Sequence, residues 1–279
     1  MRINPNAIYI IAKKEFMDNV RNKWILAMTI IFILLTIAAS VMAGGGKMGE
    51  MDVTVGALLS IATILVPIIA IMLGYATISG EAESGALSVV LSYPVRRSEV
   101  LSGKFLGLGT VICFSVLLGF GSAGLVISAT TQNTQWVGYL KFILLTMLIG
   151  LVYLSLSICC SALLKRRVTS LAAGIVVFFE AMIIGMIFFG LLYATGGSPE
   201  DFITGNFEDF PDWFWTDPFL SPSDGYQTGS MFAFELTEFF GYKVTVPDWL
   251  NMGTIVLSQL LWLIIPLILA FYFFEKRDI

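Results

Sequence analysis

The residues that could do chemistry in this chain are few, and the most compact group is the stretch Gly80–Arg97, GEAESGALSVVLSYPVRR. Two carboxylates open it, and a proline and two arginines close it. From Glu81 to Leu91 the pattern predicts a short helix, because acids favour the first turn and an apolar stripe follows. The stripe consists of Ala86, Leu87, Val90 and Leu91. Such a helix can dock in a groove on another protein, and an inert solvated turn fits the pattern equally well.

A single acid, Glu180, interrupts the long apolar stretch Val168–Ser198. A carboxylate near the middle of a membrane-spanning helix costs on the order of 2.5–3.5 kcal/mol to insert, so something must compensate it. One hypothesis places Glu180 in a pore or a dimer seam, where it contacts a substrate, a cation or a proton. The other hypothesis is a protonated or internally hydrogen-bonded acid that packs against Ser155, Ser157 or another polar residue.

The residue types that other chemistries need are missing or misplaced. A phosphate-binding loop has Ser or Thr after its Gly-Lys pair, and neither Gly-Lys pair of this chain, at 46–47 and 103–104, is followed by one. The sequence contains no histidine. Three cysteines lie in apolar segments and are interpreted as packing residues: Cys113, Cys159 and Cys160. We therefore expect no catalytic activity, no metal site and no cofactor bound by this chain.

The elements that hold these residues are predicted from composition. Of the 279 residues, 57% are hydrophobic and 13% charged, with a mean hydropathy of +0.86, whereas soluble domains are about 25% charged. Windows with little or no charge reach the roughly 20 residues that cross a bilayer as a helix. We expect one all-α membrane domain, residues 1–279, with six spanning helices. These are Trp24–Ala43, Val55–Ile78, Phe105–Thr130, Phe142–Leu164, Val168–Ala194 and Leu250–Phe274.

The distribution of positive charge predicts the orientation. With six spans, thirteen of the sixteen Lys and Arg residues share a side with both termini, and the exceptions are Lys47, Lys141 and Lys243. Positive residues near helix ends stay cytoplasmic. Both termini and the loop 79–104 are therefore expected in the cytoplasm, in a multi-pass protein of the cell (plasma or inner) membrane. Residues 4–22 are predicted to form an amphipathic helix in the membrane interface, and a cytoplasmic extension of the first span is the alternative.

The largest outer segment, residues 195–249, combines acids, prolines and many aromatic residues. Disordered segments are poor in aromatic residues, so this segment is predicted to be ordered. Its aromatic side chains fit an interfacial belt and a lid over a pore.

Three stretches together resemble a known family. Residues 80–104, GEAESGALSVVLSYPVRRSEVLSGK, are similar to the cytoplasmic loop of type-2 ABC exporter permeases, which reads roughly G-E-x-E-x-G-T-L-x-x-L-L-S-x-P-x-x-R-x-x-x-x-x-G-K. Residues 11–24, IAKKEFMDNVRNKW, look like the family's N-terminal segment. Residues 220–227, LSPSDGYQ, resemble the N-P-x-D-x-Y-R element of the Nos-type branch, the permease of a copper-maturation exporter that serves nitrous oxide reductase. Ala86, Ser221 and Gln227 depart from these patterns.

The resemblance implies a homodimeric pore driven by two separate ATPase subunits, which would bind ATP and magnesium. The loop would seat a coupling helix in each ATPase through Glu81, Glu83, Gly85, Leu87, Leu91 and Arg97. The Nos-type likeness also implies an accessory protein outside the membrane, with contacts near Trp213, Trp215, Asp224 and Tyr226. The lipid bilayer surrounds the chain, and no nucleic acid partner is expected. A secondary transporter driven by an ion gradient is the alternative class, but no matching pair of broken helices favours it.

Overall fold

The computed structural model describes residues 4–44, 51–130, 135–196, 211–235, 238–239, 242–243 and 247–278. These residues form α-helices, one 3-10 helix and one pair of two-residue antiparallel strands. The elements are α1 (Pro5–Val20), α2 (Lys23–Gly44), α3 (Met51–Gly74), α4 (Ser79–Glu83), α5 (Ala86–Leu91), α6 (Arg97–Thr130), α7 (Trp136–Leu163), α8 (Arg167–Phe178), α9 (Glu180–Ala194), η1 (Asp212–Thr216), α11 (Asp217–Leu220), α12 (Pro222–Ala233), β1 (Glu238–Phe239), β2 (Tyr242–Lys243) and α13 (Met252–Lys276).

Five of these helices are long and apolar enough to cross a membrane, namely α2, α3, α6, α7 and α13. A sixth span is formed if α8 and α9 are taken together, although they bend by 44° at their junction. The predicted membrane segments are therefore confirmed as helices, and the fifth of them is a broken helix and not a continuous one.

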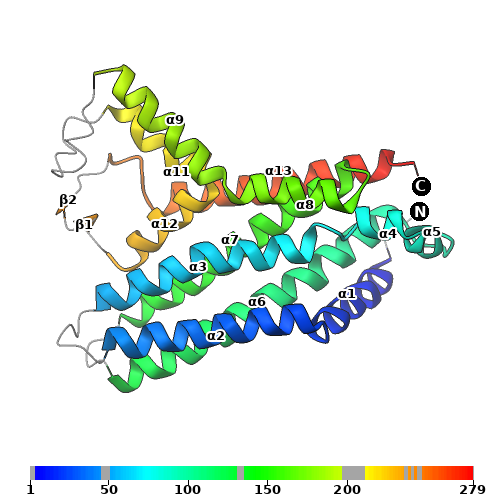
Figure 1. Cartoon of the computed structure of the whole chain (residues 1–279), viewed down its shortest axis with the longest axis horizontal. Helices are drawn as coiled ribbons and strands as arrows, with labels where there is room; N and C mark the ends of the chain where they lie inside the picture. The colour runs from blue at the N-terminus through cyan, green and yellow to red at the C-terminus, as the bar shows by residue number, and fades with distance from the viewer. Residues whose placement is uncertain are drawn as a thin grey trace.

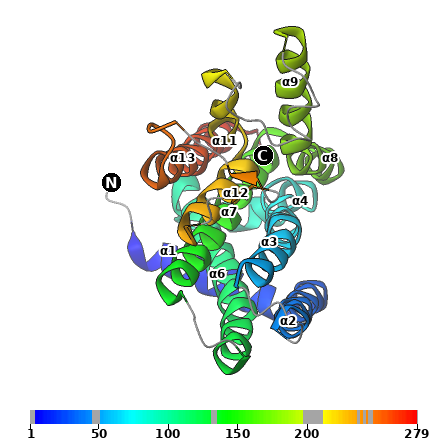
Figure 2. The same ribbon diagram turned by 90° about the vertical axis from the view of Figure 1, so that its left-hand side faces the viewer.

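The long helices α2, α3, α6, α7 and α13 run side by side along the long axis of the molecule, and α9 leaves them at an angle (Figure 1). Both chain termini lie at one end of this bundle together with α1, α4 and α5, and we call it the terminal end. Helix α7 lies in the middle and packs against α3, α6, α8, α12 and α13, as the end-on view shows (Figure 2). A row of rings, Phe32, Phe120 and Phe142, fills the core between α2, α6 and α7, with centroids 5.2 and 4.9 Å apart.

Helix α1 is separate from the first span and packs along α6. Asn4 caps its N-terminus, since the side-chain oxygen accepts a hydrogen bond from the backbone of Asn6, and Pro5 occupies the first turn as the sequence predicts. The chain leaves the helix at Arg21 and Asn22 before α2 begins. The alternative of one continuous extension of the first span is therefore wrong.

The loop between the second and third spans corrects one prediction. Residues 81–91 do not form a single helix, because α4 ends at Glu83 and α5 begins at Ala86. Between them Gly85 has φ 76°, a left-handed conformation that costs a residue with a side chain roughly 1–2 kcal/mol. Glycine is thus what allows the chain to turn between the two short helices.

Candidate coupling site and acidic cluster

The loop helices α4 and α5 present one buried face and one exposed face. Leu87 is fully buried in the core, so it holds α5 against the bundle and its side chain is not exposed for a partner. Leu91 is partly buried. The exposed side chains are instead Val89, at 62%, and Tyr93, at 66%. Within the apolar stripe Leu87 faces the bundle and Ala86 is exposed, and the part of Leu87 in ATPase coupling stays a prediction.

A buried lysine connects the loop to α1 and α6. Lys104 is 3% exposed, and its Nζ donates to Glu15 Oε1 at 2.8 Å and to Glu81 Oε1 at 2.6 Å. We call these three residues the lysine triad. The predicted coupling residue Glu81 is thus engaged inside the chain, and it joins α4 to two other helices. A buried charge needs such partners, because removal from water is costly.

Glu83 and the start of α4 make further links. Glu83 is exposed, and its carboxylate accepts a hydrogen bond from the backbone N–H of Arg167 at the start of α8, at 3.1 Å. The hydroxyl oxygen of Ser161 in α7 accepts from the backbone N–H groups of Ile78 and Ser79, both at 3.0 Å. The loop is therefore bonded to the ends of two spans besides α6.

Two arginines close the terminal end by capping helix C-termini. Arg97 Nη1 donates to the carbonyl oxygens of Phe274, Glu275 and Arg277 at 2.6–3.0 Å, and its guanidinium lies 5.8 Å from the centre of the Phe274 ring. Arg277 donates in turn to four carbonyl oxygens at the end of α7, those of Ser161, Ala162, Leu164 and Lys165. Cations at helix C-termini satisfy free carbonyls and complement the helix dipole. Arg97, the first residue of α6, thus caps the end of α13.

The break between α8 and α9 holds Glu180 in a hydrogen-bonded niche. Its Oε1 accepts from the Tyr153 hydroxyl at 2.9 Å, the Ser223 backbone at 3.2 Å and the Ser221 hydroxyl at 3.3 Å. Tyr153 also shares a 2.5 Å hydrogen bond with the Ser223 hydroxyl. Of the two hypotheses for Glu180, internal hydrogen bonding is thus present, with these partners in place of Ser155 and Ser157.

The segment SPSDGY, residues 221–226, starts α12 inside the bundle. Ser221 accepts from the Asp224 backbone at 3.1 Å and so caps the helix. Tyr226 is 1% exposed, and its hydroxyl lies 2.8 Å from that of Thr146 in α7. Asp224 is half-buried. Tyr226 is thus bonded within the chain's own core, and the expected contact of this segment with an outside protein stays a prediction.

The two predicted tryptophans pack on α9. Trp213 and Trp215 of η1 are partly buried and surround Leu192 together with Phe214, and the Trp213 ring lies 5.8 Å from that of Phe188. Figure 1 shows α9 diverging from the bundle with α11 beside it. The aromatic residues of η1 thus hold it against α9, and the lid over a pore stays a prediction.

Three carboxylates lie near one another where α9, α11 and α12 begin, and we call them the acidic cluster: Glu180, Asp217 and Asp224. Burial raises the pKa of Asp217 to about 7, and the nearby charges of Asp224 and Glu180 add to the shift. Burial also raises the pKa of Asp224, against a hydrogen bond from Ser221 that lowers it. Within the described residues no His, Cys, Asp or Glu side chains converge in a metal-binding arrangement.

Sequence reasoning missed several residues that organise these sites. Glu15 was hidden in the amphipathic pattern of the N-terminal helix, and Tyr153 and Gln259 in apolar spans. Gln259 is 1% exposed and donates to the carbonyl oxygen of Pro222 at 2.9 Å. The one available signal was polarity itself, since a charged or amide side chain in an apolar helix requires an internal partner.

Comparison with known proteins agrees with this architecture. Residues 9–279 match the sequence model of a family described as ABC-2 family transporter protein. A probable ABC transporter permease protein NosY from Stutzerimonas stutzeri is 30% identical over 98% of this chain and 99% of its own length. The corresponding NosY protein of Pseudomonas aeruginosa is 32% identical over the same shares. The chain is therefore a multi-pass membrane protein that belongs to the ABC-2 family of transporter proteins, as a permease of the NosY type.

Proposed function

We propose that this chain forms the membrane part of an ATP-driven transporter as a homodimer, with two separate ATPase subunits bound at the terminal end. ATP and magnesium would be held by those subunits and not by this chain. The terminal end would face the cytoplasm of the cell or inner membrane, in accord with its positive charge. Family membership favours this function over an ion-gradient-driven secondary transporter.

The lysine triad is the observation that carries the proposal. A partner that displaces α5 also displaces α4, and Glu81 passes that displacement to α1 and α6 through Lys104. The bond from Arg167 to Glu83 extends it to α8. The loop is thus attached to several helices of the membrane domain. Such bonds are needed if movement of the loop is to be transmitted to the spans, whereas an inert turn would not need them.

The docking surface we propose is the exposed side of α5 and the following turn. It consists of Val89 and Tyr93, with Glu83 at its edge. Aromatic and apolar side chains that are exposed on a short rigid helix are typical anchors of a protein interface. Gly85 and Leu87 would then act indirectly, because the glycine sets the angle of α5 and the leucine fixes its depth.

The experiment is to co-express the chain with its ATPase and replace Val89 with Asp. We expect at least about tenfold weaker binding and a loss of stimulated ATP hydrolysis, since an unpaired charge would enter the contact. Val137→Asp is the matched control, because Val137 is 70% exposed at the start of α7, far from the terminal end (Figure 1). Unchanged complex yield and hydrolysis in the Val89 variant would contradict the proposal.

We further propose that movement reaches the outer side through the break at Glu180, so that the chain exports a substrate or transmits force to an accessory protein there. Glu180 bonds α9 to α7 and to the start of α12. The outer surface of α9 and η1, with exposed Tyr193 and Asp212, is the part available to an accessory protein, with Trp213 and Trp215 as its support. Asp212→Lys should weaken that association without loss of export.

A further inference from the structure

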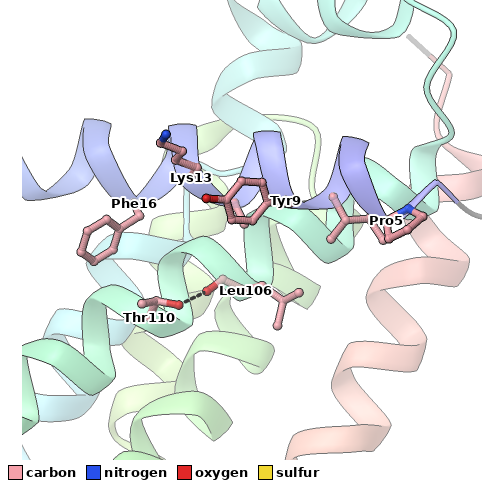
Figure 3. A pocket seen from close by; sticks show the side chains of 8 residues that line it. Pro5, Tyr9, Lys13, Phe16, Leu106 and Thr110 are labelled. Carbon is pink, nitrogen blue, oxygen red and sulfur yellow. Dashed lines mark hydrogen bonds between the residues drawn. The ribbon is translucent and has the colours of Figure 1, made fainter.

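A groove runs between α1 and α6 on the outside of the bundle (Figure 3). Its volume is about 530 Å³, within the roughly 300–1,000 Å³ of small-ligand sites. The walls include Tyr9 and Phe16 of α1 and Leu106 and Thr110 of α6. The hydroxyl of Thr110 donates to the carbonyl oxygen of Leu106 at 2.7 Å, so it requires no partner from a ligand. The interior of the groove therefore suits a hydrocarbon chain.

The two helices are held together firmly, which makes the groove preformed. A Cβ atom added at Gly107 would lie 2.5 Å from the carbonyl oxygen of Ala12, and one added at Gly103 would lie 2.7 Å from the Cβ of Ile11. Such close backbone approach is typical of tightly packed helices in membranes. The bond between Lys104 and Glu15 secures the same contact. The groove lies beside this contact between the two helices.

The surface around the groove is apolar and exposed. Tyr9 is 66% and Ile10 65% exposed on α1, and Leu106 is 51% exposed on α6. Exposed apolar surface of this kind marks a contact with membrane or protein. An amphipathic helix beside the end of a spanning helix lies at the depth where headgroups meet acyl chains. Lipid is therefore the occupant that we expect in this groove.

The charge at the rim indicates which lipid. Lys13 lies at the edge of the groove, with its amine on the opposite side of α1 from Leu106 and Thr110 (Figure 3). It forms no ion pair with an acid in the described part of the chain, whereas its neighbour Lys14 lies 3.8 Å from Asp18. An exposed ammonium on the face of α1 turned away from α6 matches a phosphate that carries a net negative charge, and an acyl chain from it would pass over the edge of α1 into the groove.

We propose that this groove binds an anionic glycerophospholipid, with one acyl chain between α1 and α6 and the phosphate at Lys13. The lipid would hold α1 against α6 in addition to the lysine triad. Because α1 is bonded to Lys104 through Glu15, the occupied groove would stiffen the connection between the loop and α6. This inference does not depend on the identity of the ATPase or of the substrate.

The test uses the full chain in nanodiscs that contain phosphatidylcholine and phosphatidylglycerol, followed by native mass spectrometry of the retained lipids. We expect Lys13→Gln to lower the preference for phosphatidylglycerol about fivefold, the factor for one lysine at an anionic surface. Lys14→Gln is the matched control on the same helix and should leave the preference unchanged. Equal losses in both variants, or no loss in Lys13→Gln, would overturn the proposal.

A second variant separates the groove from the charge. Thr110→Phe places a ring in the groove from the exposed face of α6, and it should reduce retention of both lipids while thermal unfolding stays within about 2 °C of the wild type. Lipid retention equal to that of the wild type would refute the groove as the lipid-binding site. A disulfide between two copies of a Tyr9→Cys variant would show a protein contact at this place and would also refute it.

Discussion

Replacement of Lys104 by methionine is the sharpest test of the proposal that the lysine triad transmits movement from the loop to α1 and α6. Methionine keeps most of the length of lysine and removes only the charge and its donors. In the wild type, Nζ of Lys104 lies 2.8 Å from Glu15 and 2.6 Å from Glu81. Without it, two carboxylates that contact the same nitrogen are left facing each other with little access to water.

The expected cost follows from burial. Each close pair contributes about 6 kcal/mol of attraction at an effective dielectric constant near 20, but desolvation of the lysine offsets much of it. Loss of one partner from a buried pair costs about 3–5 kcal/mol, because the other charge stays buried without compensation. The side chain of Glu81 retains 25% exposure, so we expect a value near the lower limit, about 3 kcal/mol.

The assay is unfolding of the purified chain in detergent, with stimulated ATP hydrolysis of the complex as the second readout. Lys14→Met is the control, since its exposed pair with Asp18 should contribute less than about 0.5 kcal/mol. The triple variant Lys104→Met, Glu15→Gln, Glu81→Gln should regain most of the stability but not the stimulation. A single variant within 1 kcal/mol of the wild type, or a triple variant as unstable as the single one, would refute the reasoning.

Three further predictions concern other parts of the molecule. Glu180→Ala should lower the free energy of unfolding by about 1–3 kcal/mol more than Glu180→Gln, because it leaves three donors without their acceptor; chemical unfolding of the two variants checks this, and equal losses would contradict it. Gly85→Ala should cost roughly 1–2 kcal/mol through its positive φ and weaken ATPase binding, as measured by co-purification, whereas the exposed control Ser84→Ala should do neither. The raised pKa of Asp217 disfavours ionisation in the folded state, so the contribution of this residue to stability should be fully present below the ordinary pKa near 3.9 and be lost as pH rises to about 7. Asp217→Asn should flatten that slope in thermal unfolding, and an unchanged slope would show that another group causes it.

The membrane helices could be predicted from the sequence because lipid imposes one simple requirement, a long apolar run with its backbone bonded internally. The same requirement does not reveal the break at Glu180, since Phe179 and Glu180 leave the apolar run almost unchanged. The turn at Gly85 was visible as a glycine in a short helix, but tertiary packing of Leu87 decided the direction of α5. Local periodicity assigns a face to a helix and does not say whether that face meets a partner or the chain's own core.

The polar sites were harder to predict because their partners are distant in sequence. Lys104 pairs with Glu15, 89 residues earlier, and Tyr226 bonds Thr146, 80 residues earlier. The SPSDGY segment has the composition of a surface turn, yet Ser221, Ser223 and Tyr226 are all buried in the fold. Composition measures the cost of removing polar groups from water, whereas burial also depends on the hydrogen bonds that replace the water.

The arginine caps at the terminal end have a consequence for the order of folding. The carbonyl oxygens that end α7 receive their donors from Arg277, which follows them by 112 to 116 residues. During synthesis α7 therefore enters the membrane with its last turn open to water or lipid headgroups, and it stays so until α8, α9, α12 and α13 have been added. Arg97 likewise waits for the end of α13. Both arginine caps can therefore form only once α13, the last span, is in place. Until then the spans already inserted are not joined by these bonds, and α12 can still pack between them.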